Sequence, residues 1–213
     1  MSKKAKTRKP QDVFTIPVCI PSKDGTASIN TMQMIATMQF KSLGHFNFPV
    51  VSGMHSTIPR ARNLCMQGAK KLFPEGQKML PILWIDNDME IPPSKVTDML
   101  AIAEFVKGIG SESNSVITVN YRTTVGPNTY QLLAYRTLEE NNELFMPTNV
   151  QLIERMGKKG ASGFGCLAGN FPADYVFKSN ELGEDILYFN EVNPDLYVYN
   201  GFIAGHRKSF ILQ

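Results

Sequence analysis

The sequence predicts an α/β protein with a mixed, mostly parallel central sheet flanked by helices. Two observations support this fold class. First, short apolar runs typical of strands alternate with amphipathic helical patterns between residues 13 and 119. Second, the run Leu80–Ile85 carries no charged residue, as expected for a strand buried on both faces. The chain has 213 residues, 43% of them hydrophobic, which is enough for one domain with a substantial core.

The elements of the first half follow this alternation in order. The pattern predicts a strand at residues 13–20, a helix from about 28 to 40 and a short strand at 48–52. A helix then begins at Pro59, since proline suits the first turn, and the strand at 80–85 comes next. A third helix begins at residues 92–94, and a strand at 116–119 ends this half. The predicted buried faces are Ile29, Met32, Ile35, Ala36 and Met38 in the first helix, Ala61, Leu64, Cys65, Gly68 and Leu72 in the second, and Val96, Met99, Leu100, Ala103 and Val106 in the third.

The second half has a different rhythm. The predicted strands are 130–135, 151–156, a glycine-bent strand at 161–167, and 196–199, and the predicted helices are 172–177 and about 185–190. We expect this half to be antiparallel and loop-rich, a surface suited to an acceptor. The domain organisation predicted is a disordered basic tail at residues 1–12 and a single domain at 13–213, which has a first half (13–119) and a second half (120–213).

Charge is unevenly distributed along the chain. The formal net charge is +3, but five Lys and Arg residues precede the first acid, Asp12, so the remainder carries a net −2. A broadly basic, duplex-binding surface is therefore not expected on the globular part. The tail either keeps the protein in solution or tethers it to a polyanion, which could be a nucleic acid or an anionic membrane. Three widely spaced cysteines in apolar segments, the lack of a membrane-spanning run and the lack of a signal-peptide core lead us to expect a cytoplasmic protein with buried thiols.

Two acids follow the apolar strand at 80–85. Asp86 and Asp88 lie one residue apart at its carboxyl end, where open α/β sheets bind ligands. Hard oxygen ligands there suit Mg²⁺ or Mn²⁺, and such an ion suits a diphosphate. The alternative is an ordinary polar turn. Arg60 and Arg62 lie near a helix N-terminus, where positive charge opposes the helix dipole; this indicates an anionic partner, unless both arginines simply face solvent.

Six segments, taken in order, resemble the nucleotide-sugar glycosyltransferases of the GT-A fold, near glycosyltransferase family 2. Together they extend from the first predicted strand to His206. They are Val18-Cys19-Ile20-Pro21-Ser22-Lys23-Asp24-Gly25, similar to the donor-side strand and loop; Arg60-Ala61-Arg62-Asn63, similar to an "aRN" helix start; Trp84-Ile85-Asp86-Asn87-Asp88-Met89, similar to the Asp-x-Asp strand end; Ser162-Gly163-Phe164-Gly165-Cys166-Leu167, similar to "tGf-xL"; Gly183-Glu184-Asp185-Ile186-Leu187-Tyr188-Phe189, similar to "ED-x-x-f"; and Gly205-His206, similar to a closing "gH".

This resemblance implies a metal-dependent hexosyl- or pentosyltransferase that uses a nucleotide-diphosphate sugar, by analogy a UDP-sugar. It implies Mn²⁺ or Mg²⁺ bound by Asp86, Asp88 and His206. Asp185 is implied as the base that accepts the acceptor's proton, with Glu184 as its neighbour or substitute. Acids in the first turn of a helix are also ordinary capping residues. The resemblance also implies that residues 13–213 form one GT-A-like glycosyltransferase domain, with a nucleotide-sugar-binding half (13–119) and an acceptor-side half (120–213). The implied contacts with the nucleotide sugar are Pro21, Ser22, Lys23, Asp24, Arg62, Asp86, Asn87 and Gly163.

The sequence also departs from the family pattern. Residues 51–55 contain no acid after the second strand, where many members read the nucleotide base, and Asp24 is a possible substitute. The acceptor is undefined: it could be a saccharide, a protein or a nucleic acid. Three alternatives stay open, namely a bacteriophage-type enzyme that modifies a DNA base, a nucleotidyltransferase of related fold, and a non-catalytic sugar-nucleotide-binding protein. A nucleotidyltransferase would be expected to have a glycine-rich, arginine-bearing loop in place of residues 21–24.

Overall fold

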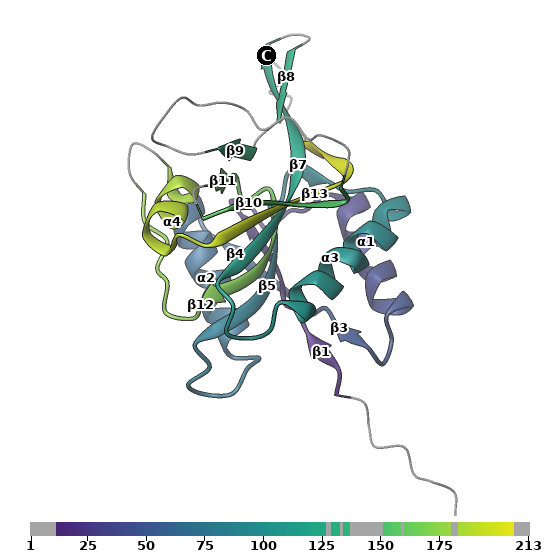
Figure 1. Cartoon of the computed structure of the whole chain (residues 1–213), viewed down its shortest axis with the longest axis vertical. Helices are drawn as coiled ribbons and strands as arrows, with labels where there is room; N and C mark the ends of the chain where they lie inside the picture. Colours follow the sequence, from purple (N-terminus) through teal and green to yellow (C-terminus); the bar gives the residue numbers. More distant parts are fainter. Residues whose placement is uncertain are drawn as a thin grey trace, which may run out of the picture.

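The computed structural model describes residues 12–126, 129–132, 134–136, 151–158, 160–179 and 183–206; within these ranges, the side chains of residues 120–136, 160 and 206 are not described. Almost all of the predicted basic tail therefore lies outside the described residues. The architecture is mixed α/β, with a central sheet between two layers of helices (Figure 1). No helix in the described part of the chain is both long and apolar enough to cross a bilayer.

Within the described residues, the central sheet has nine strands, seven of them in one continuous row. In spatial order the row is β10 (Ile153–Gly157), β13 (Asp195–His206), β7 (Ser115–Gly126), β12 (Cys166–Pro172), β5 (Met79–Ile85), β2 (Val18–Ser22) and β4 (Val50–Met54). β12 is antiparallel to both its neighbours and β10 is antiparallel to β13, whereas β4, β2, β5, β7 and β13 all point the same way. The sheet is thus mixed, with most strands in one direction, as the sequence predicts.

Short strands complete the described structure. β6 (Met89–Glu90) pairs with the end of β13, and β8 (Thr129–Leu132) pairs with β7. Two small separate sheets join β1 (Phe14–Thr15) to β3 (Phe46–Asn47) and β9 (Ala134–Arg136) to β11 (Gly160–Ser162). The predicted boundary between the two halves, at residue 119, falls inside β7, and second-half strands β12 and β13 lie in the same sheet as first-half strands.

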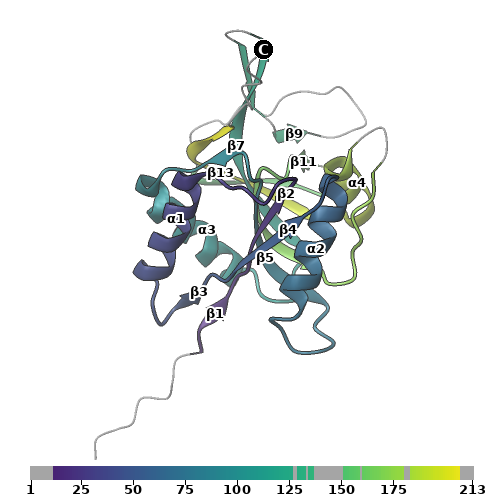
Figure 2. The same cartoon turned by 180° about the vertical axis from the view of Figure 1, so that it is seen from behind.

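Helices cover both faces of the sheet. α1 (Ile29–Lys41) and α3 (Val96–Gly108), which follows the short 3₁₀ turn η1 (Pro93–Lys95), pack on one face. α2 (Ile58–Lys70) and α4 (Glu184–Val192) pack on the other, as the front and back views show (Figures 1 and 2). The predicted order strand–helix–strand–helix–strand–helix–strand is confirmed as β2-α1-β4-α2-β5-α3-β7.

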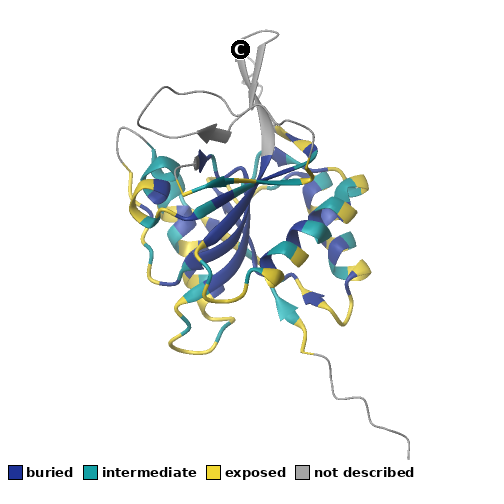
Figure 3. Cartoon of the chain, in the orientation of Figure 1, coloured by how far each residue is buried: buried dark blue, intermediate teal, exposed yellow. Residues whose placement is uncertain are grey.

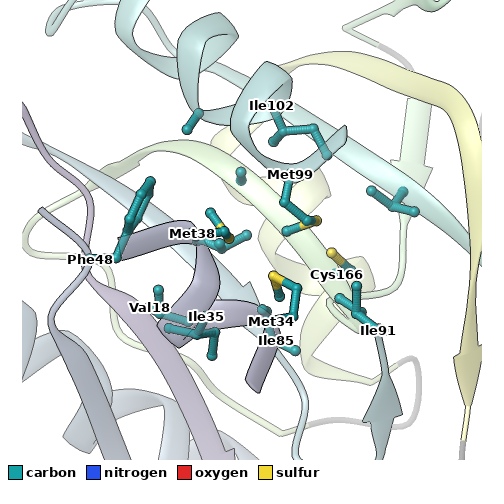
Figure 4. Close-up of a cluster of buried hydrophobic side chains, with 14 of the residues drawn as sticks. Val18, Met34, Ile35, Met38, Phe48, Ile85, Ile91, Met99, Ile102 and Cys166 are labelled. Carbon is teal, nitrogen blue, oxygen red and sulfur yellow. The ribbon is translucent and has the colours of Figure 1, made fainter. Parts of the chain in front are cut away.

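The core consists of two apolar layers separated by the sheet. Side chains of β5 alternate between them: Leu83 and Ile85 face α1 and α3, while Leu80, Ile82 and Trp84 face α2 and α4. Figure 4 shows the first layer, in which sulfur-containing side chains fill the space between the helices and the sheet. The central strands β2, β5 and β12 are the most deeply buried elements (Figure 3). All three cysteines are buried and free, as expected.

Several element predictions are wrong in detail. The strand predicted at 13–20 is divided into β1 and β2, because Pro17 has no N–H to donate to a ladder and the chain changes sheet there. The strand predicted at 130–135 likewise divides into β8 and β9, which belong to different sheets. The second half is not simply antiparallel, since β13 is parallel to β7.

The helix predicted at 172–177 does not form. β12 instead extends to Pro172, where it pairs with Met79, and the chain continues without helix to residue 179. Asn63 holds Phe177 in that extended segment: its Nδ2 donates to the Phe177 carbonyl at 2.9 Å and its Oδ1 accepts from the Phe177 N–H at 2.8 Å. Contacts distant in sequence therefore override the local helical pattern.

The predicted buried faces of α1 and α2 are also partly wrong. In α1, Ile29, Met32 and Ala36 are exposed, and the buried positions are Thr31, Met34, Ile35 and Met38. In α2, the predicted Leu64 and the following Leu72 are exposed, and the buried positions are Ala61, Arg62, Cys65, Met66 and Ala69. The face of α3 is largely as predicted, with Ile102 fully buried and Leu100 only partly so.

Candidate active site

A buried arginine connects the predicted donor-side and base residues. Arg62, on the second turn of α2, has a side chain only 2% exposed. Its Nη2 lies 3.2 and 3.3 Å from the two carboxylate oxygens of Asp86, at the end of β5. Its Nη1 lies 3.4 Å from Oδ1 of Asp185, and its Nε lies 3.6 Å from Oε1 of Glu184, both in the first turn of α4. Elements distant in sequence thus place three carboxylates around one guanidinium.

Aromatic rings form the apolar side of this site. The guanidinium carbon of Arg62 lies 4.5 Å from the ring centroid of Phe164 and about 6 Å from those of Trp84 and Phe177. Arginine can pack against such rings while its N–H groups face carboxylates, which is why burial of this cation is tolerated. The rings also exclude water, which strengthens the interactions of Arg62 with the acids.

The bend between β11 and β12 contributes backbone groups. The Phe164 N–H donates to Oδ2 of Asp185 at 3.3 Å, and the Gly165 carbonyl accepts from the Asp86 N–H at 3.0 Å. Gly163, a predicted contact with the nucleotide sugar, begins this bend. The glycine-bent strand of the sequence analysis is therefore a connection that ties the end of β5 to the start of α4.

Burial, more than the neighbouring charges, shifts the pKa of Asp185. Burial raises the pKa of Asp185 to about 6; the positive charge of Arg62 opposes this rise, while the negative charges of Asp86 and Glu184 add to it. A carboxyl group with a pKa near 6 is ionised at neutral pH yet is a stronger base than an ordinary aspartate. By contrast, burial and the charge of Asp86 raise the pKa of Cys166 to about 12, so this thiol stays protonated.

The predicted loop after β2 lies beside the turn of Asp86. Nδ2 of Asn87 lies 3.3 Å from Oγ of Ser22, which also accepts the Gly25 N–H at 2.9 Å. Asp24 is exposed, and hydrogen bonds from Thr26 and Ser22 lower its pKa to about 2. Pro21 is the fourth residue of β2, and Lys23 is exposed on the loop. The structure therefore brings Ser22, Asn87 and Asp86 to one edge of the sheet, while Lys23 and Asp24 extend outward from it.

Strand pairing brings the backbone of His206, a predicted metal ligand, next to the segment that contains Asp86 and Asp88. His206 pairs with Met89 in the β13–β6 ladder, so residue 206 lies opposite the residue that follows Asp88. The imidazole of His206 is outside the described side chains. Among the described residues, no three His, Cys, Asp or Glu side chains are grouped so as to hold a metal ion. Whether the three predicted ligands converge therefore stays a prediction.

The ion pairs of Arg62 with three carboxylates of the protein do not follow from the sequence pattern. It indicated an anionic partner for the arginines of α2, and the partner carboxylates prove to belong to the protein itself. The alternative of a solvent-facing arginine is wrong for Arg62 but holds for Arg60, which is exposed. The predicted direct contact of Arg62 with a nucleotide sugar remains untested. The available signal was two arginines in the first turns of a helix that has no acid of its own there.

Neither a protein-family model nor a curated protein sequence matches the chain. Among solved structures, the fold is similar to the crystal structure of S. aureus TarS 1-349, with 14% sequence identity and a TM-score of 0.42 over 92% of this chain. The chain covers 60% of that TarS structure. We draw no function from a likeness of this size.

Proposed function

We propose that the protein is a metal-dependent glycosyltransferase that moves a sugar from a nucleotide-diphosphate sugar, such as a UDP-sugar, to a hydroxyl acceptor. The observation that carries the proposal is the meeting of Asp86 and Asp185 at one buried guanidinium. These acids come from the Asp-x-Asp strand end and from the "ED-x-x-f" helix start. Their proximity is what a transferase requires, because the leaving diphosphate and the attacking hydroxyl must lie on either side of one sugar carbon.

Asp185 is the proposed base. As the acceptor oxygen bonds to the anomeric carbon, its proton passes to the carboxylate of Asp185, and the bond from that carbon to the diphosphate oxygen breaks. This direct displacement inverts the anomeric centre. The contacts of Asp185 with Arg62 and with the Phe164 N–H are long, at 3.4 and 3.3 Å, and each carboxylate oxygen has two lone pairs. The carboxylate of Asp185 can therefore accept a proton while Arg62 keeps this carboxylate in position.

The side chains proposed as metal ligands are of types that bind a divalent cation. Asp86 engages Arg62 through both of its oxygens, and the resemblance to the glycosyltransferases implies that Asp88 binds the ion directly. The backbone register pairs His206 with Met89, the residue after Asp88, and this supports His206 as a candidate second ligand. Mg²⁺ or Mn²⁺ held by Asp88 and His206 would neutralise charge on the leaving diphosphate. Ser22 and Asn87, already in contact, would line the donor side.

The test is release of nucleotide from a panel of nucleotide sugars with Mn²⁺ or Mg²⁺, measured with and without EDTA. We expect EDTA-sensitive turnover of at least one donor. Asp88→Ala should abolish this turnover, and it should also abolish the rise in melting temperature that Mn²⁺ gives the wild type. If no donor is turned over and Mn²⁺ leaves the melting temperature of the wild type unchanged, the proposal is wrong.

The role of Asp185 has a separate test once a donor and an acceptor are known. Asp185→Asn should still bind the donor but lose transfer, whereas Glu191→Gln, at the far end of the same helix, should behave as the wild type. The wild-type rate should fall as the pH drops below about 6, because the base must be ionised. Normal transfer by Asp185→Asn would exclude Asp185 as the base. Donor binding without turnover in the wild type would favour the non-catalytic alternative.

A further inference from the structure

The outer side of α1 is apolar although it faces solvent. Ile29, Phe40 and the following Leu43 are 72, 75 and 65% exposed, and Met32 is 38% exposed. With the exposed Ala36, they recur every three or four residues and so form one stripe along the helix. We call these five residues the α1 stripe. α1 lies at the outer edge of the molecule in both views (Figures 1 and 2), and Figure 3 shows exposed positions along it.

The other two 13-residue helices differ from α1 in this respect. The exposed positions of α3 are polar or glycine, namely Thr97, Glu104, Lys107 and Gly108. Those of α2 are Arg60, Leu64, Gln67 and Lys70, with a single large apolar residue. α1 instead exposes Ile29, Met32, Ala36 and Phe40 beside only Gln33 and Lys41. Scattered exposed apolar residues are normal, but a continuous stripe of this kind indicates an interaction surface.

Positive charge is concentrated in the part of the sequence that precedes and includes α1. The Phe14 N–H donates to the His45 carbonyl at 3.0 Å, so the chain that leads from the basic tail is fixed two residues from Leu43. Residues 1–45 contain seven Lys and Arg but only two acids, Asp12 and Asp24, and no acid occurs between residues 25 and 74. The remainder of the chain, residues 46–213, has a net charge of −2. The five cations of residues 1–11 therefore precede, in the sequence, a residue that is fixed close to the end of the α1 stripe.

We propose that the α1 stripe and the basic tail together bind an anionic membrane surface. A helix face that combines apolar side chains with neighbouring cations lies at a bilayer interface, with its apolar side in the boundary of the acyl chains. Each Lys or Arg near anionic headgroups strengthens such binding by about fivefold. Neither feature suffices alone, because the stripe has few large side chains and a tail without an apolar anchor is released by salt.

Two other binding partners, a nucleic acid and a second copy of the chain, would each account for only one of these two features. A nucleic acid would use the cations but would leave the α1 stripe in water. A second copy of the chain would cover the stripe but would bring two basic tails of like charge together. A membrane uses both features, and it does so independently of any glycosyltransferase activity.

The test is flotation of the purified full chain with vesicles. One set contains phosphatidylcholine with 30% phosphatidylglycerol, and the other contains phosphatidylcholine alone, each in 0.1 M NaCl. We expect binding to the anionic vesicles only. The double variant Ile29→Gln, Phe40→Gln should bind at least tenfold more weakly, and deletion of residues 2–9 should do the same. The matched control Leu64→Gln, Leu72→Gln replaces exposed leucines at and just beyond α2 and should bind as the wild type; circular dichroism confirms that each variant is folded.

Several results would overturn the proposal. One is absence of binding to the anionic vesicles, and another is unchanged binding by the Ile29, Phe40 double variant, which would leave only an electrostatic tether. If a duplex oligonucleotide displaces the protein from the vesicles and binds the wild type and the Ile29, Phe40 double variant equally, that result would assign the tail to nucleic-acid binding. Sedimentation that shows a dimer lost in the double variant would assign the α1 stripe to self-association.

Discussion

Replacing Arg62 by methionine tests the central contact of the site. Methionine keeps most of the volume and apolar contact with Phe164 but leaves three carboxylates without their shared cation. Breaking a fully buried ion pair by removing one partner costs about 3–5 kcal/mol. Here the side chains of Asp86, Glu184 and Asp185 are 25, 20 and 30% exposed, and water partly screens them. We therefore expect a loss of about 2–4 kcal/mol in the free energy of unfolding at pH 8.

The expected loss depends on pH with a defined sign. Arg62 lowers the pKa of Asp185 against the larger effect of burial, so its interaction with Asp185 matters only where Asp185 is ionised. The pKa of Asp185 in the folded wild type is about 6, so this side chain is largely protonated near pH 5. The loss of unfolding free energy caused by Arg62→Met should therefore be smaller at pH 5 than at pH 8.

Urea unfolding at pH 5 and pH 8, followed by tryptophan fluorescence, measures this difference. Trp84 is the only tryptophan, is fully buried and lies beside Arg62, so it reports on the site directly. Arg60→Met, on the exposed side of the same helix, is the matched control and should change stability by less than about 0.5 kcal/mol. Equal losses at both pH values, or no loss at pH 8, would refute the assignment of Arg62 as the cation that balances these acids.

Two further predictions use the same unfolding assay. Asp185→Asn should raise the urea midpoint at pH 8 but not at pH 4: the raised pKa of Asp185 means that stability is present below about pH 4 and is lost as the pH rises through about 6. A lower midpoint at pH 8 would contradict that raised pKa. Gly53→Ala should cost about 1–3 kcal/mol, because its Cβ would meet the Ala61 carbonyl oxygen and, at 2.9 Å, Sγ of Cys65. Gly108→Ala, with nothing within 4 Å, should be neutral or slightly stabilising, and an equal effect of both substitutions would show that β4 and α2 are less tightly packed than described.

The spacing of apolar residues predicts the bounds of α1 but not its buried face. The helix itself is predicted almost to the residue, because its period and its bounds are local properties. Its buried face is not, since two sets of apolar residues have helical spacing. Met34, Ile35 and Met38 pack in the core, while Ile29, Met32 and Ala36 face solvent. Choosing between two apolar faces depends on which one the sheet covers.

In the segment after β12, contacts distant in sequence prevent a helix that the local pattern predicts. Residues 172–177 have an acceptable helical pattern, but Pro172 pairs with β5 and Asn63 binds both backbone groups of Phe177. Hydrogen bonds to partners more than 80 residues away outweigh a weak local preference for helix. No window of sequence contains that information.

The sequence by itself determined the alternation of strands and helices, the deeply buried strand β5 with its acidic end, and the first-turn acids of α4, because each depends on neighbours a few residues apart. Only the tertiary structure decided that Arg62 is buried and that Asp86, Glu184 and Asp185 surround it. Arginine is usually exposed, and the burial of Arg62 requires carboxylates from segments far apart in the chain. The physical reason is that burial of a charge depends on what folding brings to it, which local spacing does not encode.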